Sequence, residues 1–157
     1  MQLISQRVAA PDLALPEIPL QLERLKLAKR RWRATAEDGA EFGVELAAPL
    51  ADGDTLWQTS AARYVVRLSP EPLLEITLAL EPAAAAAIGW AIGNLHLELS
   101  AGGGRMLTVD DPATRQLLDR LGIAYREVQE KFRAGRFEWS DGELTFRTND
   151  LGPSHRH

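Results

Sequence analysis

Apolar and polar residues alternate over short segments along the N-terminal part of the chain, and turn residues separate these segments. Residues 41–46 alternate at every position, as in a strand with one buried face, and the preceding Asp38-Gly39 is typical of a hairpin turn. Further strands are expected over residues 1–7, 20–27 and 63–68, the second with a bulge and a loop before it. Short strands separated by turns predict a small β-sandwich or barrel.

Beyond Pro70 the apolar spacing changes. Leucine and isoleucine alternate with other residues over 74–80, which predicts a half-buried strand. A helix is expected to begin at Pro82, because a proline in the first helical turn loses no hydrogen bond. Apolar residues four apart predict one buried stripe on this helix, and a left-handed cap is expected to end it. The stripe consists of Ala84, Ile88 and Ile92, and the cap is Gly93-Asn94.

A strand is predicted directly after this helix, with leucines on one face and His96 and Glu98 on the other. The elements expected next are a glycine-rich turn at 101–104, a strand at 105–109, a helix capped by Asp110 or Asp111 and ended by Gly122, and a strand at 123–128. The buried face of the second helix is predicted to consist of Leu117, Leu118 and Leu121. The resulting β-α-β-β-α-β order is that of the ferredoxin-like fold.

One more hairpin is predicted near the C-terminal end, where residues 137–140 and 143–146 flank Asp141-Gly142. The predicted class is therefore α+β. We expect a β-rich sandwich or barrel domain over residues 1–70, a ferredoxin-like domain over 71–135, and a hairpin-like extension with a tail over 136–157.

Composition limits the chemistry that this chain can support. The chain has 157 residues, a formal net charge of −4 and no cysteine, which excludes disulfides, thiolate zinc sites and cysteine nucleophiles. The negative charge argues against nucleic acid as the main partner. The first residues do not resemble a signal peptide, and no apolar run approaches the roughly 20 residues of a membrane span. We therefore expect a cytoplasmic protein that binds no membrane.

Histidines are the candidate metal ligands. His96 has two interpretations: a hydrogen-bonded histidine partly buried among leucines, or a ligand that faces away from the core beside a helix end. His155 and His157 are spaced so that both can chelate one ion from one side of an extended tail. They are equally compatible with a tag remnant or an ordinary polar terminus. Imidazole suits nickel, copper and zinc.

Other polar clusters favour structural roles. Glu75, Glu98 and Glu127 alternate with apolar residues, as on a solvated sheet face, and helix capping accounts for Asp110-Asp111. The basic run at 29–33 is expected to form a strand with Trp32 turned inward, although such a run can also contact nucleic acid or an acidic protein. No base–nucleophile pair and no nucleotide loop is visible, so an enzyme is not expected.

Several segments, in order along the chain, resemble the UreE family of urease accessory proteins. The resemblance covers about Glu41 to Phe132 and is most specific at Gly93-Asn94-Leu95-His96, which is similar to the family's Gly-Asn-x-His segment. The other segments that carry it are 36–43, 46–56 with Asp52-Gly53-Asp54, 64–66, 70–74 and 117–122.

The resemblance implies a β-rich domain that docks partner proteins and a ferredoxin-like domain that dimerises and holds metal. It implies that His96 binds nickel together with its two-fold mate, and that His155 and His157 supply further ligands. The implied partners are the urease accessory GTPase and, through it, apo-urease. Asp110, Asp111 and Pro112 stand where some members carry extra histidines, so no accessory metal site is expected there.

These observations give one leading hypothesis and one alternative. The leading hypothesis is a homodimeric, non-enzymatic metallochaperone that delivers Ni(II) for assembly of the urease active site and also binds Zn(II) or Cu(II) in vitro. The alternative is a protein-interaction or RNA-binding module without metal. If His96 were buried inside one chain, the leading hypothesis would lose the metal ligand on which it depends.

Overall fold

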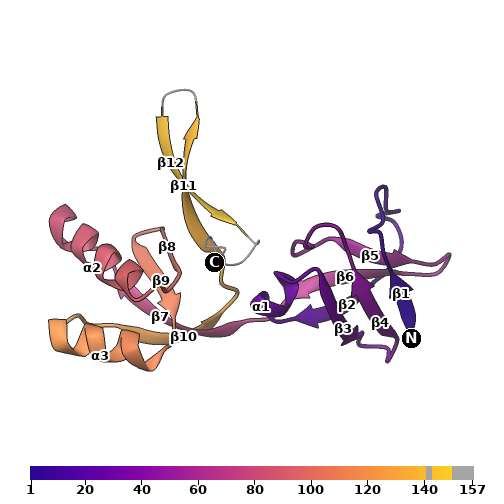
Figure 1. Cartoon of the computed structure of the whole chain (residues 1–157), viewed down its shortest axis with the longest axis horizontal. Helices are drawn as coiled ribbons and strands as arrows, with labels where there is room; N and C mark the ends of the chain where they lie inside the picture. Colours follow the sequence, from indigo (N-terminus) through magenta and orange to yellow (C-terminus); the bar gives the residue numbers. More distant parts are fainter. Residues whose placement is uncertain (141–142, 150–157) are drawn as a thin grey trace. The chain divides into compact units, whose positions relative to one another are not determined.

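The computed structural model describes residues 1–140 and 143–149 (Figure 1). These residues divide into two compact units, Met1–Ser69 and Pro70–Asn149, and each unit has its own hydrophobic core. The chain is α+β, as predicted. None of the helices in these residues has the length and apolar character that crossing a bilayer requires.

The first unit contains two three-stranded sheets and one short helix. Its elements are β1 (Gln2–Ile4), β2 (Glu17–Leu22), α1 (Arg24–Leu27), β3 (Arg31–Thr35), β4 (Glu41–Glu45), β5 (Thr55–Gln58) and β6 (Arg63–Leu68). One sheet has the order β1-β4-β3 and the other the order β2-β6-β5. In each sheet the central strand pairs with one parallel and one antiparallel neighbour.

The predicted hairpin at Asp38-Gly39 is confirmed, because β3 and β4 are antiparallel neighbours on either side of this turn. Gly39 has a φ of 86°, a left-handed conformation that glycine adopts without strain. Trp32 is buried while Arg31 and Arg33 on either side of it are exposed, so the predicted inward orientation of Trp32 is also confirmed.

The strand predicted over residues 20–27 is wrong in its second half. Strand β2 begins inside the predicted loop and ends at Leu22, and α1 follows as a single helical turn. The backbone N–H of Leu27 donates to the carbonyl oxygen of Glu23 at 2.9 Å. In this turn Leu27 is fully buried and Leu25 is exposed. Two leucines at a spacing of two residues point different ways on a helix, which the alternation alone did not reveal.

The second unit combines a four-stranded sheet, two helices and a hairpin. Its elements are β7 (Glu71–Thr77), α2 (Pro82–Asn94), β8 (Leu99–Gly102), β9 (Arg105–Val109), α3 (Pro112–Leu121), β10 (Arg126–Glu130), β11 (Ala134–Ser140) and β12 (Glu143–Asn149). The sheet has the order β10-β7-β9-β8, and all its neighbours are antiparallel.

Both helices of the second unit pack on one face of this sheet (Figure 1). The buried residues between them are Leu74, Ile76, Ile88, Ile92, Met106 and Leu118. The other face is covered near Leu73 by Phe132 and Ala134. Strand β7 is therefore buried on both faces, which corrects the half-buried strand predicted from its alternation.

Both predicted helices are present. Pro82 is the first residue of α2, although the predicted stripe residue Ala84 is exposed. Asp111 caps α3 by accepting from the N–H of Ala113 at 2.8 Å, and Gly122 ends it with a φ of 66°.

The predicted buried face of α3 is only partly right. Thr114 and Leu118, one helical turn apart, are fully buried and Leu117 is partly buried, whereas Leu121 in the last turn is exposed. The predicted C-terminal hairpin consists of the antiparallel strands β11 and β12. Its turn at residues 141–142 lies outside the described residues.

Candidate functional site

His96 lies at the C-terminal end of α2, not on a strand. The N–H of Leu95 donates to the carbonyl oxygen of Ile92 at 3.0 Å, and the N–H of His96 donates to that of Gly93 at 2.9 Å. Strand β8 begins only at Leu99. The strand predicted directly after the helix is therefore wrong at its start, because the last carbonyls of the helix bind the amides that a sheet would need.

His96 also occupies the left-handed position that was predicted for Gly93-Asn94. Its φ is 57°, and among the described residues it is the only non-glycine residue with a positive φ. Histidine, like asparagine and aspartate, adopts this conformation more often than other side chains do. The helix still ends at Asn94, but the left-handed residue that follows it is His96.

The side chain of His96 is exposed, so the interpretation of a histidine buried inside one chain is excluded. Trp90 of α2 is 71% exposed, and Leu95, which directly precedes His96, is also exposed. Helix α2 contains no charged residue from Pro82 to Asn94. The partial negative charge of the helix C-terminus lies beside His96 and favours a cation there.

The backbone is anchored on both sides of His96. Helix α2 holds the residues before it through the fully buried Ile92. After it, the hydroxyl of the buried Thr108 donates to the carbonyl oxygen of Glu98 at 2.9 Å, and Leu97 and Leu99 pack against the core. The backbone at His96 is therefore held in place on both sides before any ligand arrives.

Among the described residues, His96 is the one histidine and has no cluster of further candidate metal ligands around it. The described residues contain no group of three or more histidine, aspartate and glutamate residues that could hold a metal ion. The predicted ligands His155 and His157 lie outside the described residues, so their role stays a prediction. A single imidazole holds a divalent ion only weakly, so a metal site at His96 would need a second source of ligands.

The other carboxylates near α3 are engaged in structural contacts. Asp110 accepts from two nitrogens of Arg115 at 2.6 Å, and the same guanidinium binds Glu127 at 2.6 Å. Arg115 holds the pKa values of both carboxyl groups below their usual range. Together with the capping role of Asp111, these contacts account for the acidic pair without a metal.

Glu75 was predicted to lie on a solvated sheet face, and the structure shows that this prediction is wrong. It is buried on the face of the sheet that carries no helix, where it accepts from Arg105 at 2.6 Å and from Arg126 at 2.7 Å. Arg105 also binds both carboxylate oxygens of Glu130 at 2.8 Å. Hydrogen bonds from Arg126 and then Arg105 lower the pKa of Glu75. Only the pairing of β7 with β9 and β10 brings these residues together.

Comparison with known proteins supports this picture of the second unit. The family model for the C-terminal domain of the UreE urease accessory protein matches residues 71–157. The urease accessory protein UreE of Geobacillus kaustophilus is 36% identical over 133 residues, which cover 76% of this chain and 87% of that protein. That of Ectopseudomonas mendocina is 29% identical over 151 residues, which cover 96% and 90%.

A further relative extends well beyond this chain. The urease accessory protein UreE of Bifidobacterium longum subsp. infantis is 32% identical over 115 residues, 73% of this chain. The match spans only 52% of the length of that protein.

Proposed function

This chain belongs to the UreE family of urease accessory proteins, and on that premise we propose that it carries Ni(II) for assembly of the urease active site. UreE is a family of accessory proteins and not of enzymes. The observation that carries the proposal is His96, an exposed imidazole at the anchored end of α2.

The metal is held between two chains. A two-fold axis through the end of α2 gives the ion two imidazoles without any further ligand in the sequence. Helix α2 is suited to such a contact, because it is uncharged and exposes Trp90, and the exposed Leu95 and His96 follow at its end. Large aromatic side chains that are exposed on a monomer are frequent anchors of interfaces. The second unit is then a ferredoxin-like dimerisation domain, in keeping with its β-α-β-β-α-β order.

His155 and His157 complete the coordination in this proposal. The ligands at the helix end hold the ion in place, and the tail ligands bind and leave as the ion is loaded and transferred. A site that is partly open and partly adjustable suits a carrier, because a carrier must release its ion. Zn(II) and Cu(II) suit the same imidazole ligands, so supply in the cell decides which ion is carried.

The proposed partners are those that the family implies: the urease accessory GTPase and, through it, apo-urease. We assign the docking of partner proteins to the first unit. We also assign the protein to the cytoplasm and expect it to bind neither nucleic acid nor membrane. The tight metal site and the docking surface then belong to different units of the chain.

The experiment that tests this function is activation of apo-urease in the presence of its accessory GTPase complex. The nickel source is the preloaded chain, and a chelator removes free nickel. We expect the wild-type chain to restore urease activity and the His96→Gly chain, treated with nickel in the same way, to leave urease inactive. Equal activation by both chains would contradict the proposal.

A further inference from the structure

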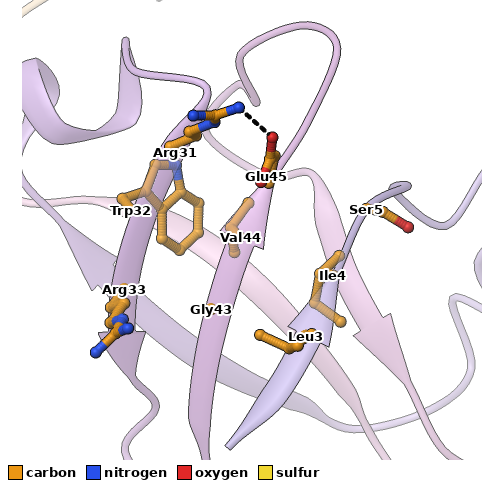
Figure 2. A pocket seen from close by; sticks show the side chains of 9 residues that line it. All are labelled: Leu3, Ile4, Ser5, Arg31, Trp32, Arg33, Gly43, Val44 and Glu45. Carbon is orange, nitrogen blue, oxygen red and sulfur yellow. Dashed lines mark hydrogen bonds and ion pairs between the residues drawn. The ribbon is translucent and has the colours of Figure 1, made fainter.

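The first unit has a hollow on the outer face of its β1-β4-β3 sheet, and Figure 2 shows the residues that line it. Its volume is about 610 Å³. In the strand register, Leu3 of β1 lies opposite Gly43 of β4, and Gly43 lies opposite Arg33 of β3. These three residues therefore form one row across the sheet, with an apolar side chain at one end, a cation at the other and no side chain between them.

Gly43 forms the floor of this row. A Cβ atom on Gly43 would lie 2.9 Å from the Cδ2 atom of Leu3, so the leucine side chain extends over the glycine. Leu3 nevertheless keeps 73% of its surface exposed. A second hollow of about 300 Å³ lies along the same strands and is lined by Met1, Lys26 and Arg33 among others. The exposed apolar side chains of Met1 and Leu3 therefore line the same two hollows as the cations Lys26 and Arg33.

The cations of this face are not equivalent. Arg31 binds Glu45 at 2.5 Å on the surface of the sheet. Within residues 1–140 and 143–149, Arg33 and Lys26 take part in no ion pair. Arg33 lines both hollows, so its guanidinium is available to a ligand in either one.

We propose that this face binds an extended segment of a partner protein that carries a carboxylate two residues along from a bulky apolar side chain, so that both side chains face the sheet. The apolar side chain contacts Leu3 and Met1, and the carboxylate binds Arg33. A planar guanidinium binds a carboxylate with two parallel hydrogen bonds, which fixes the orientation of the segment as well as its position. The proposal deepens the docking role assigned to the first unit and does not depend on nickel.

The charges on this face favour an acidic peptide over nucleic acid. Glu41 and Glu45 lie on the same face as Gly43, each two residues away from it along β4. A polyanionic phosphate backbone would meet both carboxylates, whereas a peptide with one or two carboxylates can place them on Arg33 and Lys26 alone. The exposed Leu3 and Met1 add an apolar contact that a phosphate backbone does not use.

The test measures binding of a fluorescein-labelled peptide on the full-length chain by fluorescence anisotropy. Leucine and aspartate occupy every second position of the peptide in turn, with serine between them, so that both kinds of side chain lie on one face of the extended peptide. We expect saturable binding that weakens about tenfold in Arg33→Gln, the scale of a lost charge-assisted hydrogen bond. Leu3→Ser is expected to weaken binding by a similar factor. Both residues are exposed, so both variants should fold, which circular dichroism verifies.

Matched controls separate this face from general surface effects. Leu13→Ser removes a leucine that is 72% exposed elsewhere in the first unit, and Arg120→Gln removes an exposed arginine of α3. Neither is expected to change peptide binding. Nickel titration of the Arg33 and Leu3 variants should match the wild type, so that failure of this inference and failure of the metal proposal are distinguishable.

Several results would overturn the inference. The first is no saturable binding of the peptide, and the second is equal binding by wild type and Arg33→Gln. A third is equal binding of a peptide with asparagine in place of aspartate. Binding that depends on Arg33 with an RNA hairpin or with phosphatidylglycerol vesicles, but not with the peptide, would assign the face to another class of ligand.

Discussion

His96 donates its backbone N–H to the carbonyl oxygen of Gly93 at 2.9 Å, and this hydrogen bond accompanies a φ of 57° at His96. The last turn of α2 thereby holds the backbone of His96. A histidine in this conformation is less stable than a glycine would be, so packing alone does not account for it. The proposed ligand role of His96 would explain why a side chain is kept at this position.

The left-handed backbone predicts how His96 variants differ in stability. We expect His96→Gly to be more stable than His96→Ala by about 1 kcal/mol, because alanine in a left-handed conformation is strained and glycine is not. Denaturant unfolding of the two variants under identical conditions measures this difference. Equal stability of the two would mean that the conformation at His96 is not the one described.

The exposure of Trp90 predicts which surface two chains would use to associate. We expect Trp90→Glu to convert the proposed dimer to a monomer, because it places a charge on a helix that otherwise has none. Sedimentation equilibrium at tens of micromolar protein measures the oligomeric state. The matched control is Leu13→Glu, which adds a charge at an equally exposed residue of the first unit. A dimer that survives Trp90→Glu would place the interface elsewhere.

Nickel binding is predicted to depend steeply on pH. An imidazole binds a metal only in its neutral form, so protons and nickel compete for the same nitrogen. We expect the affinity to fall progressively between about pH 7.5 and about pH 5.5, the range in which histidine side chains ordinarily titrate. Titrations at several pH values in one non-chelating buffer series measure this dependence. A pH-independent affinity would show that carboxylates rather than histidines hold the ion.

The ion pairs of Glu75 with Arg105 and Arg126 predict that the second unit loses stability in acid. Its pKa is lowered from the ordinary 4.5 by Arg126 and then Arg105, so its contribution to stability is fully present above pH 4.5. That contribution is lost as the pH falls through the lower pKa of the folded state. We therefore expect Glu75→Gln to be less stable than wild type at neutral pH, and the difference to shrink below pH 4.5.

Denaturant unfolding at a series of pH values tests this expectation. The control is Glu37→Gln, which removes an exposed carboxylate of the first unit that takes part in no ion pair within the described part of the chain and lies at no helix end. The stability of this control should follow that of the wild type at every pH. A stability gap for Glu75→Gln that stayed constant down to about pH 3 would contradict the assignment.

Local signals in the sequence predicted those parts of the fold that local interactions determine. Asp38-Gly39 predicted a hairpin, Pro82 a helix start and Gly122 a helix end, because each follows from the backbone preferences of a few residues. The short turn of α1 was missed, because two leucines at a spacing of two residues fit a strand as well as a single helical turn.

The surroundings of the candidate site depend on contacts that the sequence does not display. Gly93-Asn94 offers two good left-handed residues, yet the structure places that conformation at His96, two residues beyond the predicted position. The pairing of β7 with β9 and β10 buries Glu75 between two arginines, and this register is a tertiary property. The exposure of His96 likewise follows from how α2 ends on its sheet.

The most direct test of the central claim is nickel titration by calorimetry on the tag-free dimer. We expect the wild-type protein to bind one tight ion per pair of chains and His96→Gly to lose that site. Deletion of residues 154–157 should weaken the site by about ten- to hundredfold, because tail ligands add affinity but must be ordered on binding. Loss of nickel binding on tail deletion, together with intact binding in His96→Gly, would show that the site is a chelate of the tail and that His96 is not its anchor.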